Sequence, residues 1–268
     1  MTAFARPMLR LAAALLALAL ACGSPGRVAR ASEAPLIAAA SDLQFALAEL
    51  ADAFTRRTGQ AVKLAFGSSG NFARQIRQGA PFEVFLSADE KYVRDLAREG
   101  LLRDEGALYA IGRIVLFVPR GSPLTADGTL ADLRAALRDG RLRKFAIANP
   151  EHAPYGRRAE EALRHAGLWD AIRPRLVLGE NVSQAAQFAT SGSADGGIIA
   201  YSLALSPRVS ALGSYSLIPE QWHEPLRQRM ALVRKAGPAA VRFYEFAQSP
   251  AARAILRKYG FVLPGEPV

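Results

Sequence analysis

Short apolar segments alternate along the chain with longer segments whose apolar residues recur at helical spacing. The short segments predict β-strands, and the longer ones predict amphipathic helices. In the first predicted helix, Leu43, Leu47 and Leu50 fall on one stripe that can pack against a sheet. The strands are expected at residues 36–40, 61–66, 84–87, 114–118, 145–148, 175–178, 197–200 and 230–233. This alternation predicts an α/β fold with parallel sheets and helices on both faces.

The N-terminus has a different pattern. Two arginines precede an unbroken apolar stretch over residues 11–21, and Ala29 and Ala31 put small residues at the −3 and −1 positions of a cleavage site. Such a stretch is too short to cross a bilayer as a helix, but the arrangement is typical of a secretory signal peptide. We therefore expect residues 1–31 to be a signal peptide and the mature, soluble, periplasmic protein to begin at Ser32.

Cys22 opens an alternative. The segment Leu20-Ala21-Cys22-Gly23 is similar in part to a lipidation motif, whose cysteine would carry a membrane anchor. The −3 position of this motif is Ala19, where such motifs usually carry Leu. We favour the soluble product and keep a lipoprotein anchored at Cys22 as the alternative.

The charge and the metal-ligand residues exclude several classes of function. The net charge of +10 falls to +6 without the first 31 residues, which hold four arginines and no acid. The remaining charge is spread along the chain, so we expect a solvated basic surface and no nucleic-acid partner. A single cysteine and three scattered histidines also argue against a disulfide framework and a metal site.

Four predicted strands end in a small or polar turn that opens a helix. These turns contain Ser41, Ser69, Tyr155 and Val182. The first N–H groups of a helix lack partners within it, and the helix dipole is positive there. Since strand carboxyl ends face the ligand crevice of an open α/β sheet, four such turns can form an oxyanion site from neutral donors. Taken singly, these residues are ordinary caps and packing residues; the set indicates a ligand.

Familiar catalytic motifs are absent from the sequence. It contains no Gly-x-Ser-x-Gly elbow and no His-Glu-x-x-His pair, and Gly67-Ser68-Ser69-Gly70-Asn71 lacks the Gly-Lys-Ser/Thr ending of a phosphate loop. The sequence therefore favours a binding protein over an enzyme, with no catalytic residue and no cofactor.

At these turns the chain resembles the periplasmic molybdate-binding proteins of ABC transporters. The resemblance covers nearly all of the mature chain in order. The matching segments are Ala38-Ala39-Ala40-Ser41-Asp42-Leu43, Phe66-Gly67-Ser68-Ser69-Gly70, Ala73-Arg74-Gln75-Ile76, Gly79-Ala80-Pro81, Phe85-Leu86-Ser87-Ala88-Asp89, Asn149-Pro150-Glu151-His152-Ala153-Pro154-Tyr155-Gly156, Glu180-Asn181-Val182 and Lys258-Tyr259-Gly260-Phe261.

The resemblance implies a two-lobed solute-binding fold in which two crossover strands join the lobes. The crossovers would lie near residues 114–118 and 230–233. Residues 32–113 and 231–268 would form lobe one, and residues 114–230 would form the inserted lobe two. The oxyanion would bind in the cleft between them.

The resemblance also implies a set of ligand donors. Ser41 and Ser69 match hydroxyl donors of the family, and Tyr155 and Val182 match residues that donate through backbone N–H groups. The amides of Asp42 and Asn181 are expected as further donors. Because its carboxylate would repel an oxyanion, the Asp42 side chain is expected to turn away from the ligand.

One position departs from the family pattern. Some members carry a ligand-binding tyrosine where this sequence has Ala200, and Tyr201 comes one residue later. A shift of one residue along a strand turns the side chain to the other face, so Tyr201 is not expected to donate. A water or another amide is expected in its place.

The resemblance implies a monomeric receptor that binds molybdate, and also tungstate, and delivers it to an inner-membrane ABC permease. Two alternatives stay open. One is a receptor for another oxyanion, such as sulfate, phosphate or a small organic acid. The other is the effector-binding domain of a transcription regulator, which the predicted signal peptide disfavours.

Overall fold

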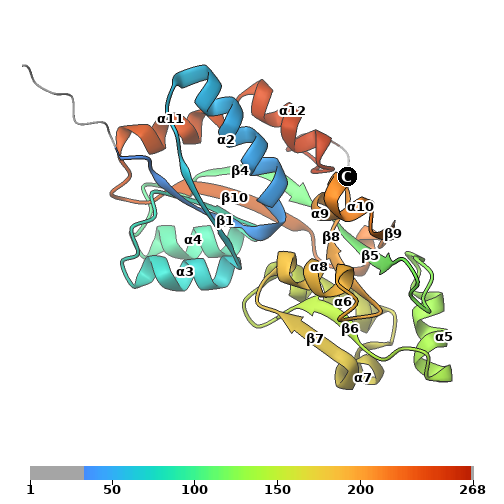
Figure 1. Cartoon of the computed structure of the whole chain (residues 1–268). Coiled ribbons are helices and arrows are strands. Elements are labelled where there is room, and N and C mark those ends of the chain that lie inside the picture. The colour runs from blue at the N-terminus through green and yellow to red at the C-terminus, as the bar shows by residue number, and fades with distance from the viewer. Residues whose placement is uncertain (1–32, 267–268) are drawn as a thin grey trace, which may run out of the picture. The chain divides into compact units, whose positions relative to one another are not determined.

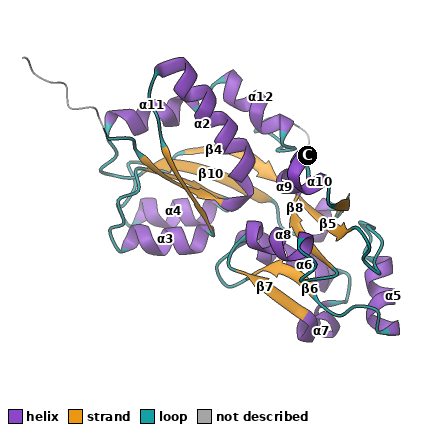
Figure 2. Ribbon diagram, viewed as in Figure 1, coloured by secondary structure: helices purple, strands orange, loops and turns teal. Residues whose placement is uncertain are grey.

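Ten strands form two five-stranded sheets in the computed structural model, which describes residues 33–266 (Figure 1 and Figure 2). The first sheet has the order β2-β1-β3-β10-β4, and the second has the order β7-β6-β8-β5-β9. The first sheet consists of β1 (Leu36–Ala40), β2 (Lys63–Gly67), β3 (Val84–Ser87), β4 (Ala107–Gly112) and β10 (Leu226–Leu232). The second consists of β5 (Ile114–Pro119), β6 (Phe145–Ala148), β7 (Leu176–Gly179), β8 (Gly196–Ala200) and β9 (Gly213–Leu217). The predicted signal peptide and Cys22 lie outside the described residues.

Helices cover both faces of the first sheet, and together they form the first lobe. In Figure 1, α2, α11 and α12 lie on one side of this sheet, and α3 and α4 lie on the other. The helices are α2 (Gln44–Thr58), α3 (Ser69–Arg77), α4 (Glu90–Arg98), α11 (Pro238–Phe246) and α12 (Pro250–Lys258). The predicted stripe of α2 is buried, with Leu47, Leu50 and Phe54 at most 1% exposed. Burial of these side chains is what attaches the helix to the sheet.

The second sheet and its helices form the second lobe around one core, in which Phe117, Phe145 and Ile147 are fully buried. Its helices are α5 (Ala131–Asp139), α6 (Pro154–His165), α7 (Trp169–Ile172), α8 (Val182–Thr190), α9 (Tyr201–Ala204) and α10 (Pro207–Ser210). The described chain also contains the short 3₁₀ helices η1 (Ser41–Leu43), η2 (Arg173–Arg175) and η3 (Glu220–Trp222). Among residues 33–266, no helix has both the length and the apolar character of a membrane span.

The α/β fold class predicted from the sequence is confirmed, but the sheets are mixed where we expected parallel strands. β10 runs antiparallel to β3 and β4, and β5 runs antiparallel to β8 and β9. These strands enter their sheets directly from the other lobe or from a short connection. The right-handed helical crossover that produces a parallel pair is therefore missing at these positions.

The chain passes between the sheets twice. It leaves the first sheet at Gly112, and β5 begins in the second sheet at Ile114. It returns between the end of β9 at Leu217 and the start of β10 at Leu226. The return was expected at residue 230, but β10 pairs with β4 from its first residue, so residues 226–230 belong to the first sheet. Three consecutive polar residues, Arg227, Gln228 and Arg229, interrupt the apolar pattern near the start of this strand and hide its beginning in the sequence.

Candidate functional site

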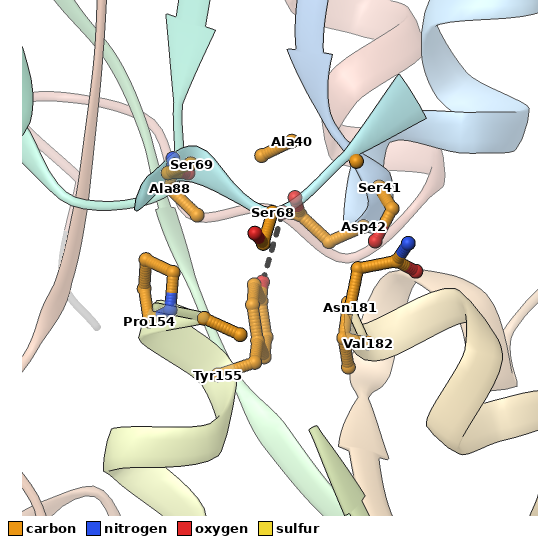
Figure 3. A pocket seen from close by; sticks show the side chains of 12 residues that line it. Ala40, Ser41, Asp42, Ser68, Ser69, Ala88, Pro154, Tyr155, Asn181 and Val182 are labelled. Carbon is orange, nitrogen blue, oxygen red and sulfur yellow. Dashed lines mark hydrogen bonds between the residues drawn. The ribbon is translucent and has the colours of Figure 1, made fainter. Parts of the chain in front are cut away.

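All six residues expected to bind a ligand line one small cavity between the two lobes (Figure 3). About 180 Å³ among its lining residues is not filled by protein atoms, and this volume includes space that is open to solvent. Its lining residues are Ala40, Ser41, Asp42, Gly67, Ser68, Ser69, Ala88, Ala153, Pro154, Tyr155, Asn181 and Val182. They come from the ends of β1, β2 and β3 in the first lobe and from the starts of α6 and α8 in the second. The four predicted turns therefore meet at one place.

Two helices of the second lobe begin at the cavity. Tyr155 is the second residue of α6, behind Pro154 at the first position, and Val182 is the first residue of α8. The side chain of Asn181 caps α8 by accepting hydrogen bonds from the N–H groups of Ser183 and Gln184. Tyr155 and Val182 lie in the first turn of their helices, where backbone N–H groups have no acceptor within the helix. Their N–H groups are therefore available to a ligand.

Two serine hydroxyls of the first lobe are oriented by backbone donors. Ser69 Oγ accepts a hydrogen bond from the N–H of Ala88 at 3.0 Å, and Ser41 Oγ accepts one from the N–H of Ser183 at 3.2 Å. Both serines are buried. Since the oxygen of each hydroxyl accepts from the backbone, its own hydrogen is free to point at a ligand. None of the described lining residues is a lysine or arginine, so the donors of this cavity are neutral.

The Asp42 side chain does not turn away from the site, and that expectation was wrong. Asp42 is 1% exposed, and its Oδ2 accepts hydrogen bonds from Tyr155 Oη at 3.0 Å and from Gln228 Nε2 at 2.7 Å. The hydroxyl of Ser202 donates to the Asp42 carbonyl at 2.8 Å. Figure 3 shows the bond to Tyr155 as a dashed line across the cavity. These donors draw the carboxyl inward.

The Asp42 contacts belong to a buried polar network that joins the lobes. Tyr109 Oη donates to Gln228 Oε1 at 2.6 Å, and Gln228 Nε2 also lies 3.1 Å from Tyr155 Oη. Asp42, Tyr109 and Gln228 belong to the first lobe, whereas Tyr155 belongs to the second. Gly112 lies against this network at the first crossover, where a Cβ atom would collide with Tyr155 Oη and with the Gln228 amide. The crossover therefore needs a residue without a side chain.

Burial sets the protonation of this network. Burial raises the pKa of Asp42 to about 6, although the hydrogen bonds from Gln228 and Tyr155 oppose that change. Burial and the nearby Asp42 raise the pKa of both Tyr109 and Tyr155 well above the ordinary tyrosine value. The two phenols are thus neutral hydrogen-bond donors at physiological pH, and Asp42 is the network member that titrates near neutrality.

The sequence profile of the bacterial extracellular solute-binding proteins matches residues 35–262, which include both lobes and every residue of the cavity. The chain belongs to this family.

Several relatives of this solute-binding protein have named ligands. The chain is 37% identical to the molybdate-binding protein ModA of Rhodobacter capsulatus over 80% of this chain and 82% of the relative. It is 34% identical to the molybdate-binding protein ModA of Azotobacter vinelandii over 92% and 97% of the two chains. A solved structure titled Azotobacter vinelandii periplasmic molybdate-binding protein superimposes with a TM-score of 0.77 and 32% identity, over 86% of this chain and 99% of that one.

Contacts between the lobes surround the cavity of this solute-binding protein. The N–H of Gly70 donates to the carbonyl of His152 at 3.0 Å, and His152 Nδ1 lies 3.0 Å from Ser68 Oγ. On another side, the guanidinium of Arg157 pairs with Asp89 at 3.1 Å and donates to Tyr92 Oη at 3.2 Å. The side-chain amide of Asn71 in the first lobe donates a hydrogen bond to the carboxylate of Glu180 in the second lobe. These contacts hold the lobes in a closed arrangement.

Sequence reasoning missed several residues that the structure brings to the site: Ser68, Ala88, Tyr109, His152 and Gln228. The sequence contains a feature that could have identified Gln228 as a site residue. Strand alternation puts it on the same face as Leu226 and Met230, so it is a polar residue on a buried face, and it is 0% exposed. Such a residue needs hydrogen-bond partners.

Tyr201 does not line the cavity. Its ring packs against Tyr215, with the ring centroids 5.8 Å apart, and its backbone N–H donates to the carbonyl of Arg113. The one-residue offset from the family position thus places this side chain in the second lobe's packing.

Proposed function

We propose that this solute-binding protein binds molybdate, and also tungstate, in the cavity between its lobes and delivers it to an inner-membrane ABC permease. The observation that carries the proposal is the convergence of neutral donors from both lobes on one cavity. The relatives named for molybdate binding supply the identity of the anion. An anion that contacts both lobes stabilises the closed state, because that state alone presents both sets of donors.

The proposed donors are of two kinds. The hydroxyls of Ser41 and Ser69 donate from the first lobe, and the backbone N–H groups of Tyr155 and Val182 donate from the second. The backbone amides of Asp42 and Asn181 complete the set. Hydrogen bonds to a charged acceptor are strong in a cavity of low dielectric, so neutral groups suffice to hold a dianion. The protein contacts the oxygens of the anion, and no side chain binds the metal atom directly.

The proposed role is that of a monomeric receptor without a cofactor and not that of an enzyme. None of the donors is a general base placed beside a nucleophile, which acyl or phosphoryl transfer requires. The expected work of the protein is capture, closure around the anion and release to the permease.

Calorimetry of the purified protein with four anions tests this function. Molybdate and tungstate are expected to bind at least about tenfold more tightly than sulfate or phosphate, because a cavity of fixed donors discriminates by size and by whether every acceptor is satisfied. Phosphate belongs in the comparison because a protonated phosphate can donate to the Asp42 carboxyl. Tighter binding of sulfate or phosphate than of molybdate would assign the site to that anion.

Export is tested separately at the N-terminus. We expect the mature protein in a periplasmic extract to begin at Ser32, without a cysteine, because cleavage after Ala31 follows the small residues of the signal-peptide site. N-terminal sequencing and intact-mass measurement decide the point. A mature chain that begins with an acylated Cys22 would make the protein a membrane-anchored lipoprotein instead.

A further inference from the structure

A carboxyl group in the wall of an oxyanion site presents an electrostatic problem. Asp42 lines the cavity beside Ser41, one of the proposed donors, and it is almost fully buried. As a carboxylate it would repel a dianion across a short distance in a medium of low dielectric. The ligand cannot gain full affinity unless that negative charge is removed or neutralised.

No cation performs that neutralisation in the described part of the chain. The side chains that face the Asp42 carboxyl group are Tyr155 from α6 and Gln228 from β10, and Tyr109 from β4 lies one contact further. The backbone N–H groups of Asp42 and Leu43 also stabilise the carboxylate form. Ser202 from α9 reaches only the Asp42 carbonyl. All of these groups are neutral at physiological pH.

The ionisable side chains that lie near the cavity face one another. Arg157 pairs with Asp89, and His152 Nε2 lies 3.5 Å from a carboxylate oxygen of Glu180. Neither pair makes a hydrogen bond to Asp42. A proton is therefore the available means of neutralising the Asp42 carboxylate.

We propose that the cavity takes up its oxyanion together with one proton, which Asp42 carries on Oδ1. The inference rests on the proposed function, since it concerns the same anion. The two carboxyl oxygens are not equivalent: Oδ2 already accepts two hydrogen bonds, whereas Oδ1 is buried and has no partner among the described residues. A proton on Oδ1 leaves both existing bonds intact. It also converts a buried acceptor that makes no hydrogen bond in the described chain into a donor, on a residue that lines the cavity.

The direction of the pH dependence follows from linkage. Burial raises the pKa of Asp42 to about 6 in this closed arrangement without a bound anion, and a bound dianion raises it further. Below that pKa the proton is already in place, and affinity is highest and constant. Above it, affinity falls by up to about tenfold for each pH unit, until the pH reaches the higher pKa of the complex. Binding near neutral pH therefore consumes a proton from solution.

Calorimetry in buffers with different ionisation enthalpies measures this proton. At about pH 7.5, which lies above the free pKa of Asp42, the wild-type protein is expected to take up close to one proton for each molybdate bound. Asp42→Asn keeps the shape of the side chain and has no charge to remove. That variant is expected to take up no proton when it binds molybdate. Its affinity for molybdate is expected not to change with pH between about pH 6.5 and about pH 8.5.

A second variant tests whether the proton resides on Asp42. Tyr155→Phe removes one of the two donors that stabilise the carboxylate form, so the pKa of Asp42 rises further. The fall in affinity is then expected to begin at a higher pH than in the wild type. Unfolding curves of both variants establish that they are folded.

The possible outcomes distinguish a failure of the proton inference from a failure of the proposed function. Wild-type binding of molybdate without proton uptake and without pH dependence overturns the proton inference and leaves the proposed function standing. Proton uptake that persists in Asp42→Asn also overturns it, because the proton then resides on another group or on the anion. Failure of the wild type to bind molybdate at any pH overturns the proposed function itself. If Asp42→Asn does not fold, the proton count of the wild type and the shift in Tyr155→Phe still decide.

Discussion

Replacing Gly70 by Ala is expected to weaken molybdate binding about 100-fold or more, although the residue donates nothing to the cavity. A Cβ atom at this position would lie 2.6 Å from the carbonyl oxygen of His152 and 2.8 Å from Tyr92 Oη. The lobes can then no longer close, and the anion loses the N–H donors of Tyr155 and Val182. Each hydrogen bond to a charged ligand contributes about 1.5–3 kcal/mol, so two lost donors give at least this factor.

The stability of the unliganded Gly70→Ala protein separates blocked closure from damage to the fold. Alanine is a better helix former than glycine, so the first lobe is expected to melt at the same temperature or slightly higher. Gln75→Ala, an exposed change in the same helix α3, is the matched control and should bind normally. Calorimetry and thermal melts provide both readouts. Wild-type affinity in Gly70→Ala would show that closure at this contact is not needed.

Removing both serine hydroxyls is expected to lower molybdate affinity at least about 100-fold, because Ser41→Ala and Ser69→Ala each delete one donor to a buried anion. The double variant also loses two acceptors for backbone N–H groups, those of Ser183 and Ala88. We therefore expect a moderate decrease in the free energy of unfolding, of about 1 kcal/mol for each site. The loss of affinity should exceed the loss of stability by a wide margin.

Ser206→Ala is the matched control for the serine variants. This serine is also buried, and its hydroxyl donates to the carbonyl of Leu203 within the second lobe, away from the cavity. Its free energy of unfolding should fall by about as much as in one of the single serine variants, and its affinity for molybdate should not change. If the double variant binds molybdate as tightly as Ser206→Ala does, the anion is not held where we propose.

Both experiments address a site that depends on geometry shared between two lobes. The hydroxyls come from the first lobe, and the helix N-termini come from the second, so neither lobe alone encloses an anion. The network of Asp42, Gln228 and Tyr155 joins the same two lobes, and both Asp42 and Tyr155 line the cavity. Proton binding at Asp42 and closure of the lobes therefore act on the same set of contacts.

Local pattern determined much of the fold. Apolar runs identified eight of the ten strands in the described chain, most clearly β3, β6 and β8, because a strand buried on both faces is a continuous run of apolar residues. The edge strand β9 was not predicted, because its residues are mostly polar and half exposed. β4 escaped for another reason: only Arg113 separates it from β5, so the sequence shows one run where the chain changes sheets. Nothing in the residues around Gly112 marks that change.

The sequence by itself determined which residues could donate, because serine hydroxyls and helix starts at strand ends are local features. The four turns that contain Ser41, Ser69, Tyr155 and Val182 were identified in this way, whereas the roles of Tyr155 and Val182 as backbone donors came from the resemblance to the molybdate-binding proteins and stay predictions. The direction of the Asp42 carboxyl could not be found so, because the donors that hold it lie 113 and 186 residues away in the chain. Only the tertiary structure brings Tyr155 and Gln228 against it. A buried carboxyl group takes its orientation and its proton affinity from such distant neighbours, and a one-dimensional pattern does not contain them.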